Sequence, residues 1–296
     1  MFRHTCFYII FVMLVIVFAV RHGSAAEQSL DRSTPTVQQP IPQDIVDKFS
    51  LDDFYQKCIL VDDFPIVASA KVHDSALQET AYVVQAMLEG RGDVLRQLAA
   101  NRVRLTVMAV SERTCDVPEH SDLTPKEYWN RRARGLGATK HRPSISCAEE
   151  NVLNLPGDPY RKECILIHEF SHAIHQMALV DLDPMFQANL QACFEAAQEN
   201  EAWKGTYAGS NVNEYWAEGV QSWFDCNTEN DSQHNHVNTR EELKEHDPKL
   251  YALIESVFPN ASYRYVRSDS PERSEAHLQG LDRTKLGTFK WDRGEK

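Results

Sequence analysis

The sequence has few of the features that mark membrane-spanning or nucleic-acid-binding proteins. Its one long apolar run, residues 7–20, contains 14 residues, fewer than the roughly 20 that a membrane-spanning helix needs. Acidic residues outnumber basic ones, which gives a net charge of −12. This balance disfavours nucleic acid and anionic membrane surfaces as partners. Internal repeats are also absent, which argues against a repeat architecture.

The N-terminus has the pattern of a secretory signal. Residues 1–26 combine a basic start at Arg3, the apolar run and small residues ending at Ala26. We expect cleavage after Ala26, secretion, and no stable membrane insertion of the mature chain; a signal-anchored membrane protein is the alternative. Two N-glycosylation sequons, at Asn230 and Asn260, fit the secretory route.

Seven cysteines are present, and six of them lie beyond the predicted signal peptide. An even set of this kind suits disulfide bonding in an oxidising compartment. The spacing does not fix the pairing. The favoured pair is Cys115–Cys147, because both residues lie in loop-like segments, and the second candidate pair is Cys193–Cys226.

The most informative feature that is present is the sequence HEFSH at residues 168–172. His168 and His172 are four residues apart, so on a helix both imidazoles lie on one face and can reach one metal ion. Glu169 is turned aside from that face, where its carboxylate can take a proton from a metal-bound water. The alternative is a core helix with two hydrogen-bonded histidines, which would bury three polar groups together at a cost.

The residues around this motif predict a buried helix. Asp158 supplies an N-cap oxygen, and Pro159 suits the first helical position. Cys164 stands one turn before His168, so a fourth sulfur ligand is conceivable, although a buried thiol or a disulfide is favoured. The apolar residues of the run indicate a core position; they are Cys164, Ile165, Leu166, Ile167, Phe170, Ala173, Ile174 and Met177.

A third ligand is expected from a second helix. Glu214 and Glu218 are four residues apart on one face of a helix that opens at Asn211 or Asn213. One carboxylate can bind zinc while the other supports a ligating imidazole, and the spacing alone does not say which. A solvated acidic pair is the alternative, and the apolar residues of this helix argue against it; they are Tyr215, Trp216, Val220, Trp223 and Phe224.

Together these motifs resemble the gluzincin zinc peptidases, most closely the branch that contains anthrax lethal factor and the Pro-Pro endopeptidases. Tyr207 precedes Glu214 by seven residues, and residues 214–218 (EYWAE) match the E-[FY]-[FW]-A-E box of that branch. The similarity covers about residues 158–226. It implies that zinc is bound by His168, His172 and Glu214, that Glu169 is the general base, that Tyr207 donates to the oxyanion, and that Glu218 supports a ligand from behind.

The resemblance implies a secreted zinc metallopeptidase, more specifically an endopeptidase, that hydrolyses polypeptides with one Zn²⁺ per chain. Two alternatives stay open: a secreted zinc-binding interaction module without catalysis, and a zinc hydrolase of a non-peptide amide or a glycan. Glu169 argues against the first, because a site without catalysis does not need this carboxylate. Hydrolysis assays on a panel of peptides and glycans would test the second alternative, the non-peptide hydrolase. The sequence indicates neither the cleavage preference nor the oligomeric state.

The rest of the chain predicts one α+β domain, mainly helical, with a small sheet beside the HEFSH helix. We expect a disordered lead-in at residues 27–45, the catalytic domain at 46–265 and a solvated polar tail at 266–296. Residues 111–157 are expected to be irregular. Their basic stretch, residues 131–144 (RRARGLGATKHRPS), is interpreted as a protease-sensitive loop. The alternative is a role in framing the cleft or in binding acidic groups.

Individual elements follow from periodicity and capping residues. The alternation in residues 103–110 predicts a half-buried strand, and the resemblance makes it the candidate edge strand that pairs with a peptide substrate. His175 is not expected to be a ligand, and His234 and His236 are expected to be solvated in a polar loop. Further expected elements are a strand at 58–61, a helix that Asp74 or Ser75 caps and that stops at Gly90, and helices at 94–100, 183–202 and 247–258.

Overall fold

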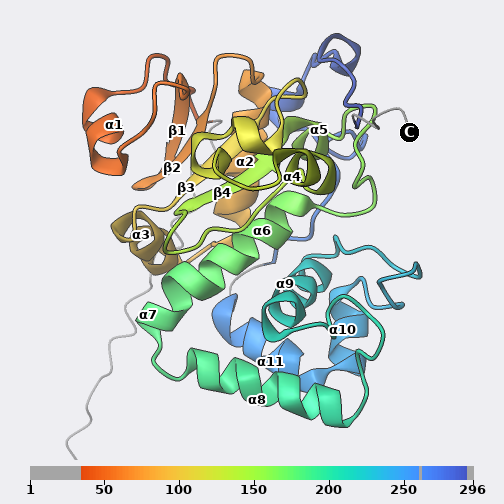
Figure 1. Cartoon of the computed structure of the whole chain (residues 1–296). Helices are drawn as coiled ribbons and strands as arrows, with labels where there is room; N and C mark the ends of the chain where they lie inside the picture. Colours follow the sequence, from red (N-terminus) through yellow and green to blue (C-terminus); the bar gives the residue numbers. More distant parts are fainter. Residues whose placement is uncertain (1–34, 260–261, 292–296) are drawn as a thin grey trace, which may run out of the picture. The chain divides into compact units, whose positions relative to one another are not determined.

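The computed structural model describes residues 35–259 and 262–291. Its fold is α+β, as expected, with a four-stranded mixed sheet and helices packed beside it (Figure 1). The predicted signal peptide and the sequon at Asn260 lie outside the described residues, and Asn230 is exposed. Within the described ranges, none of the helices combines the length and the apolar character needed to cross a bilayer.

The sheet has the strand order β1–β2–β3–β4. Strands β1 and β2 form an antiparallel hairpin, whereas β2 with β3 and β3 with β4 pair in parallel. Parallel neighbours need a crossover, and two helices, α2 and α3, supply it between β2 and β3. The bounds are β1 Lys57–Val61, β2 Phe64–Ala68, α2 Asp74–Met87, α3 Gly92–Ala100, β3 Arg104–Met108 and β4 Ser144–Ala148.

Strand β3 lies inside the sheet, so the expectation that residues 103–110 form a half-buried, substrate-pairing edge is wrong. Strand β4 separates β3 from the edge, and the polar face of β3 is buried as well. Arg104 on that face pairs with Glu119, with Nη2 2.5 Å from Oε1, and the Thr106 hydroxyl lies 3.1 Å from the Tyr55 hydroxyl. The alternating pattern therefore reflects an internal polar network that covers this face.

The helix that carries the HEFSH motif is α6 (Ile165–Ile174), which continues through a π-helical turn, His175–Leu179, into α7 (Val180–Leu182). The sequence analysis expected this helix to begin after Asp158, but it begins at Ile165. Asp158 instead stabilises a local turn, in which its Oδ1 accepts from the Tyr160 amide at 2.9 Å. The N-cap residue is Cys164, whose side chain does not cap the helix. Asn151 supplies the acceptor from outside the helix, because its Oδ1 accepts from the Ile165 amide at 2.8 Å. Helix α6 packs on β4 on one side and on α9 on another (Figure 1).

The C-terminal half of the chain is a group of helices. Asn211 caps α9 through the amides of Asn213 and Glu214, and Asp247 caps α11 through the Leu250 amide, which confirms the sequence expectation for these two helix starts. Helix α9 packs against α6, α8, α10 and α11. The bounds are α8 Phe186–Glu199, α9 Val212–Trp223, α10 Arg240–His246 and α11 Pro248–Val257.

Two segments that were expected to be unstructured belong to the fold. Residues 35–45 are not a disordered lead-in, because Gln38 pairs with Cys58 at the sheet and Ile41 is buried beside α1 (Gln43–Phe49). Residues 266–291 are not a solvated tail, because Arg273 makes a buried ion pair with Glu79 at 2.8 Å. The sequence interpretation failed here because these segments contribute single anchoring residues rather than a periodic apolar face.

The expectation of an irregular segment at 111–157 is also wrong. Besides β4, this region contains two helices, α4 (Lys126–Arg132) and α5 (Glu149–Val152). In its basic stretch, Arg134 is fully buried and pairs with Glu150, with Nε 2.6 Å from Oε1. The basic stretch is thereby fixed to the core.

All six described cysteines are free thiols, so the expected pairs Cys115–Cys147 and Cys193–Cys226 are not formed. The loop assignment behind the first pair was wrong, because Cys147 lies in β4 within the core. Cys193 is half-buried on α8, whereas Cys226 follows α9 and its carbonyl accepts from the Cys164 amide at 3.2 Å. Burial raises the pKa of Cys147 and Cys226 well above the ordinary value.

Candidate metal centre

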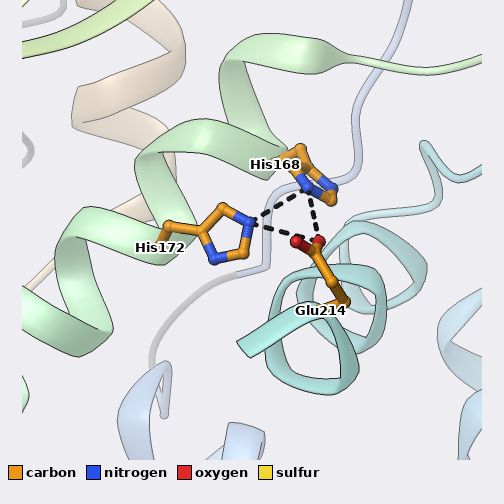
Figure 2. Close-up of side chains that lie close together, drawn as sticks. All are labelled: His168, His172 and Glu214. Carbon is orange, nitrogen blue, oxygen red and sulfur yellow. Dashed lines mark hydrogen bonds and ion pairs between the residues drawn. The ribbon is translucent and has the colours of Figure 1, made fainter. Parts of the chain in front are cut away.

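Three side chains from two helices converge where α6 and α9 pack against each other. His168 and His172 stand on one face of α6, and their Nε2 atoms are 3.1 Å apart. Glu214, from the first turn of α9, places Oε2 3.2 Å from His168 Nε2 and 3.3 Å from His172 Nε2. Figure 2 shows the three groups pointing toward one another. Of the two carboxylates that spacing left open, Glu214 and not Glu218 lies near the Nε2 atoms of both histidines.

The group could hold a metal ion. Zinc bonds of 2.0–2.2 Å in tetrahedral geometry imply ligand atoms about 3.3–3.6 Å apart, and the three separations observed lie at or a few tenths of an ångström below the lower end of this range. Glu214 Oε2 is buried and receives no well-directed hydrogen bond within the described residues. Buried polar atoms normally have a partner, and a cation bound by both imidazoles would supply one here.

The electrostatics of the site favour a cation. Burial disfavours the imidazolium form of His168, but the carboxylates of Glu214, Glu169 and Glu218 outweigh burial and raise the pKa of His168 to about 10. Burial also opposes ionisation of Glu214, yet the two histidines hold its pKa well below the usual range. The site is thus built to keep positive charge between the histidines and the carboxylate.

Glu169 lies beside this group and is not part of it. Its carboxyl group lines a cavity of about 400 Å³ that also reaches His168. Burial raises the pKa of Glu169 above the ordinary value for a glutamate, against the opposing effect of His168 and His172. A carboxylate with a raised pKa is a stronger base, as a proton acceptor in a cleft requires.

The imidazole of His168 is oriented from behind by a residue that the sequence analysis missed. Gln221 Oε1 accepts from His168 Nδ1 at 2.7 Å, whereas Glu218 Oε1 is 3.5 Å away. A donor proton on Nδ1 leaves the Nε2 lone pair free for a metal. The signal in the sequence was spacing, since Gln221 follows Glu214 by seven residues and so shares its helix face.

Glu218 connects the site to a loop that was expected to be solvated. Its Oε2 accepts from Asn227 Nδ2 at 3.0 Å and lies 3.5 Å from His234 Nε2. The side chain of His234 is only 11% exposed, and its Nδ1 is 2.9 Å from Asp231 Oδ1. The expectation of a solvated His234 is therefore wrong, because the amide of Tyr207 donates to the carbonyl of Gln233 and ties this loop to the site.

Three further residues from the sequence analysis lie outside the metal-binding group: His175, His236 and the candidate sulfur ligand Cys164. His175 Nε2 is 2.7 Å from Gln187 Oε1 on α8, and His236 stacks edge-on against His246. Burial raises the pKa of Cys164 to about 12, so its thiol stays protonated near neutral pH. None of these three residues belongs to the metal-binding group.

Tyr207 is close enough to the group to act on it. Its ring stacks on His168, with the centroids 6.3 Å apart. Burial, together with the Glu214 carboxylate, raises the pKa of the Tyr207 phenol, and Arg132 opposes that shift by hydrogen bonding to it. The phenol is therefore protonated and can donate a hydrogen bond into the cavity.

No family model matches this chain, and no curated protein matches it. The similarity of the motifs at residues 158–226 to the gluzincins thus remains an expectation from the sequence. The metal-binding group rests on the contacts between α6 and α9 described above.

A short extended segment, residues 135–137, forms the edge of the sheet beside α6. Leu136 pairs antiparallel with Ser146 of β4, and no backbone hydrogen bond within the described residues involves Gly135 or Gly137. A Cβ added to Gly135 would lie 2.9 Å from Glu169 Cγ, and one added to Gly137 would lie 2.9 Å from His172 Cβ. Glycine at both positions lets the edge approach the helix. The sequence analysis placed this edge wrongly, at residues 103–110.

Proposed function

We propose that the protein is a secreted zinc metallopeptidase. The observation that carries this proposal is the convergence of His168, His172 and Glu214 beside a cavity that Glu169 lines. A zinc ion held by these three residues would supply a Lewis acid and lower the pKa of a water in the remaining position. The predicted signal peptide supports secretion.

Glu169 is the general base of the proposed reaction. Its burial raises its pKa, which suits a group that takes a proton from the attacking water and returns it to the leaving amine. Tyr207 donates a hydrogen bond to the developing oxyanion, a role that fits its protonated phenol and its contact with His168. No serine or cysteine nucleophile is needed.

The unpaired edge at residues 135–137 favours a polypeptide substrate. In an antiparallel pair the backbone groups of successive residues point to opposite sides of the strand. Since Leu136 uses its amide and carbonyl toward Ser146, those of Gly135 and Gly137 face away from β4. An extended peptide can add to such an edge as a further strand, beside Glu169 and His172. A glycan has no backbone amides to make this pairing.

The test is a substitution of the general base. The purified chain, loaded with zinc, should contain one zinc per chain and cleave a mixed peptide library. Glu169→Gln should keep the metal and lose cleavage by at least roughly 100-fold, the lower range for general acid–base catalysis. The matched control is Glu199→Gln, an exposed glutamate at the end of α8, which should behave as the wild type. A Glu169→Gln variant with normal turnover, or a wild type without zinc, would refute the proposal.

A further inference from the structure

One carboxylate in the cavity takes no part in the proposed chemistry. Glu163 lies in the turn before α6 and lines the same cavity as His168 and Glu169. Its amide donates to the Tyr160 carbonyl at 3.1 Å, and its carbonyl accepts from Asn151 Nδ2 at 3.0 Å. Hydrogen bonds therefore hold both the amide and the carbonyl of Glu163, so its Cα has a fixed position at the wall of the cavity.

The side chain of Glu163 is half-buried and poorly satisfied. Gln221 Nε2 is its one hydrogen-bond partner in the described part of the chain, at 3.4 Å from Oε2, and the same amide also lies 3.5 Å from the Cys164 carbonyl. No ion pair or hydrogen bond within the described residues involves Oε1. Burial and the nearby Glu218 raise the pKa of Glu163. The charges of His168 and His234 oppose this shift, but no cation among the described residues forms an ion pair with the Glu163 carboxylate.

The other charges of the cavity do not supply that partner. Glu218 is satisfied by Asn227, and Glu169 is assigned to the proposed reaction. Arg132 is the one arginine or lysine among the described residues that line the cavity. It is exposed, and its guanidinium is engaged by the hydroxyls of Tyr207 and Tyr128. The lining as a whole therefore carries more carboxylates than fixed cations.

We infer that this cavity accepts a basic side chain of the substrate, lysine or arginine, with Glu163 as its ionic partner. The inference rests on the proposed function and adds a substrate class to it. The cavity, at about 400 Å³, has room for a long side chain, and it opens beside His168 and Glu169. A residue next to the scissile bond could therefore enter it. An ammonium or guanidinium group would give Glu163 Oε1 the charged donor that it lacks.

The experiment uses two peptide hydroxamates that differ only in the side chain next to the metal-binding group, lysine in one and norleucine in the other. Their affinities for the zinc-loaded chain are measured by titration calorimetry, without turnover. The wild type should bind the lysine compound roughly tenfold more tightly, the scale of one charge pair in a cleft. Glu163→Gln should reduce that ratio to about one and leave the norleucine affinity unchanged, while Glu199→Gln should keep the wild-type ratio.

The outcomes separate this inference from the proposed function. Equal affinities in the wild type, a ratio that Glu163→Gln does not change, or no binding of either compound to the zinc-loaded chain would overturn the inference. Selective binding that depends on Glu163, combined with no cleavage of any peptide, would refute the peptidase proposal and leave the basic-side-chain pocket standing. A Glu163→Lys variant guards against a local folding defect in Glu163→Gln: it should bind a third hydroxamate, with glutamate at the same position, more tightly than the lysine compound.

Discussion

At the scale of single residues, the hydrogen-bond partner of a candidate metal-binding histidine distinguishes it from an ordinary histidine only in combination with its position. His168 can present Nε2 to a metal because Gln221 Oε1 accepts a hydrogen bond from Nδ1 at 2.7 Å. His175, on the same helix, has the same kind of partner, Gln187, at the same distance. Yet His175 is not part of the metal-binding group. Substituting each glutamine in turn therefore distinguishes two roles: orienting a histidine for metal binding, and holding an ordinary core histidine.

We predict that Gln221→Leu weakens zinc binding by about 10- to 100-fold, the usual cost of losing a partner behind a ligating histidine. The loss follows because the tautomer and the ring orientation of His168 are no longer fixed. Competition against a chromophoric chelator measures the affinity. Gln187→Leu is the control and should leave zinc affinity unchanged, since His175 binds no metal in the proposed site. Equal effects of the two changes would show that Gln221 has only a packing role.

At the scale of the elements, the decisive arrangement is the contact of the 135–137 edge with α6. The closeness depends on two glycines, because a Cβ at either position would lie within 3 Å of a side-chain atom of α6. Real Cβ atoms do not come so close, so an alanine must displace the edge or the helix. Under the proposed function this edge positions the substrate, and small displacements of such an element are costly for catalysis.

We predict that Gly137→Ala lowers kcat/KM for peptide hydrolysis by about 100-fold, because the added Cβ displaces the edge from His172. Gly92→Ala is the control, since its added Cβ meets only the ends of two flexible side chains, Arg96 at 3.1 Å and Asp62 at 3.5 Å. Steady-state kinetics on one fluorogenic peptide, with circular dichroism to check the fold, would measure the difference. Full activity in Gly137→Ala would mean that the edge does not position the substrate.

The sequence predicted the elements that have a repeating pattern or a capping residue. The i, i+4 histidines and the pair Glu214 and Glu218 could be placed on helix faces from spacing alone, and Asp247 marked the start of α11. The contacts that complete the site come from segments distant in sequence and without periodicity. His234 reaches the site through its loop, and residues 135–137 reach α6 through one bridge to β4. Such contacts depend on tertiary packing, which local patterns do not contain.

At the scale of the whole molecule, the C-terminal segment is attached to the N-terminal half of the fold. Glu79 of α2 is buried and accepts from Arg273 Nη1 and Nη2 at 2.9 and 2.8 Å, and His277 Nε2 is 2.7 Å from the same carboxylate. A buried carboxylate depends on such partners. The segment expected to be a solvated tail is therefore part of the stability of the domain.

We predict that Arg273→Met lowers the free energy of unfolding by about 3 kcal/mol, because it leaves the buried Glu79 carboxylate without its main cation. The control is Arg267→Met, in the same segment. Its pair with Asp269 is partly exposed on both sides, so its loss should cost no more than about 1 kcal/mol. Urea denaturation followed by tryptophan fluorescence measures both. Similar costs for the two variants would indicate that residues 266–291 are only loosely attached.

The division of the ligands between two helices has a consequence for the lifetime of the protein. His168 and His172 come from α6 and Glu214 from α9, and the unfolded chain would not keep these groups together. Under the proposed function, zinc therefore binds the folded chain only, and at a thousand times its dissociation constant it adds about 4 kcal/mol to stability. Starvation for zinc would then remove activity and protection against proteolysis at once, so the abundance of the protein would follow the metal supply of its surroundings.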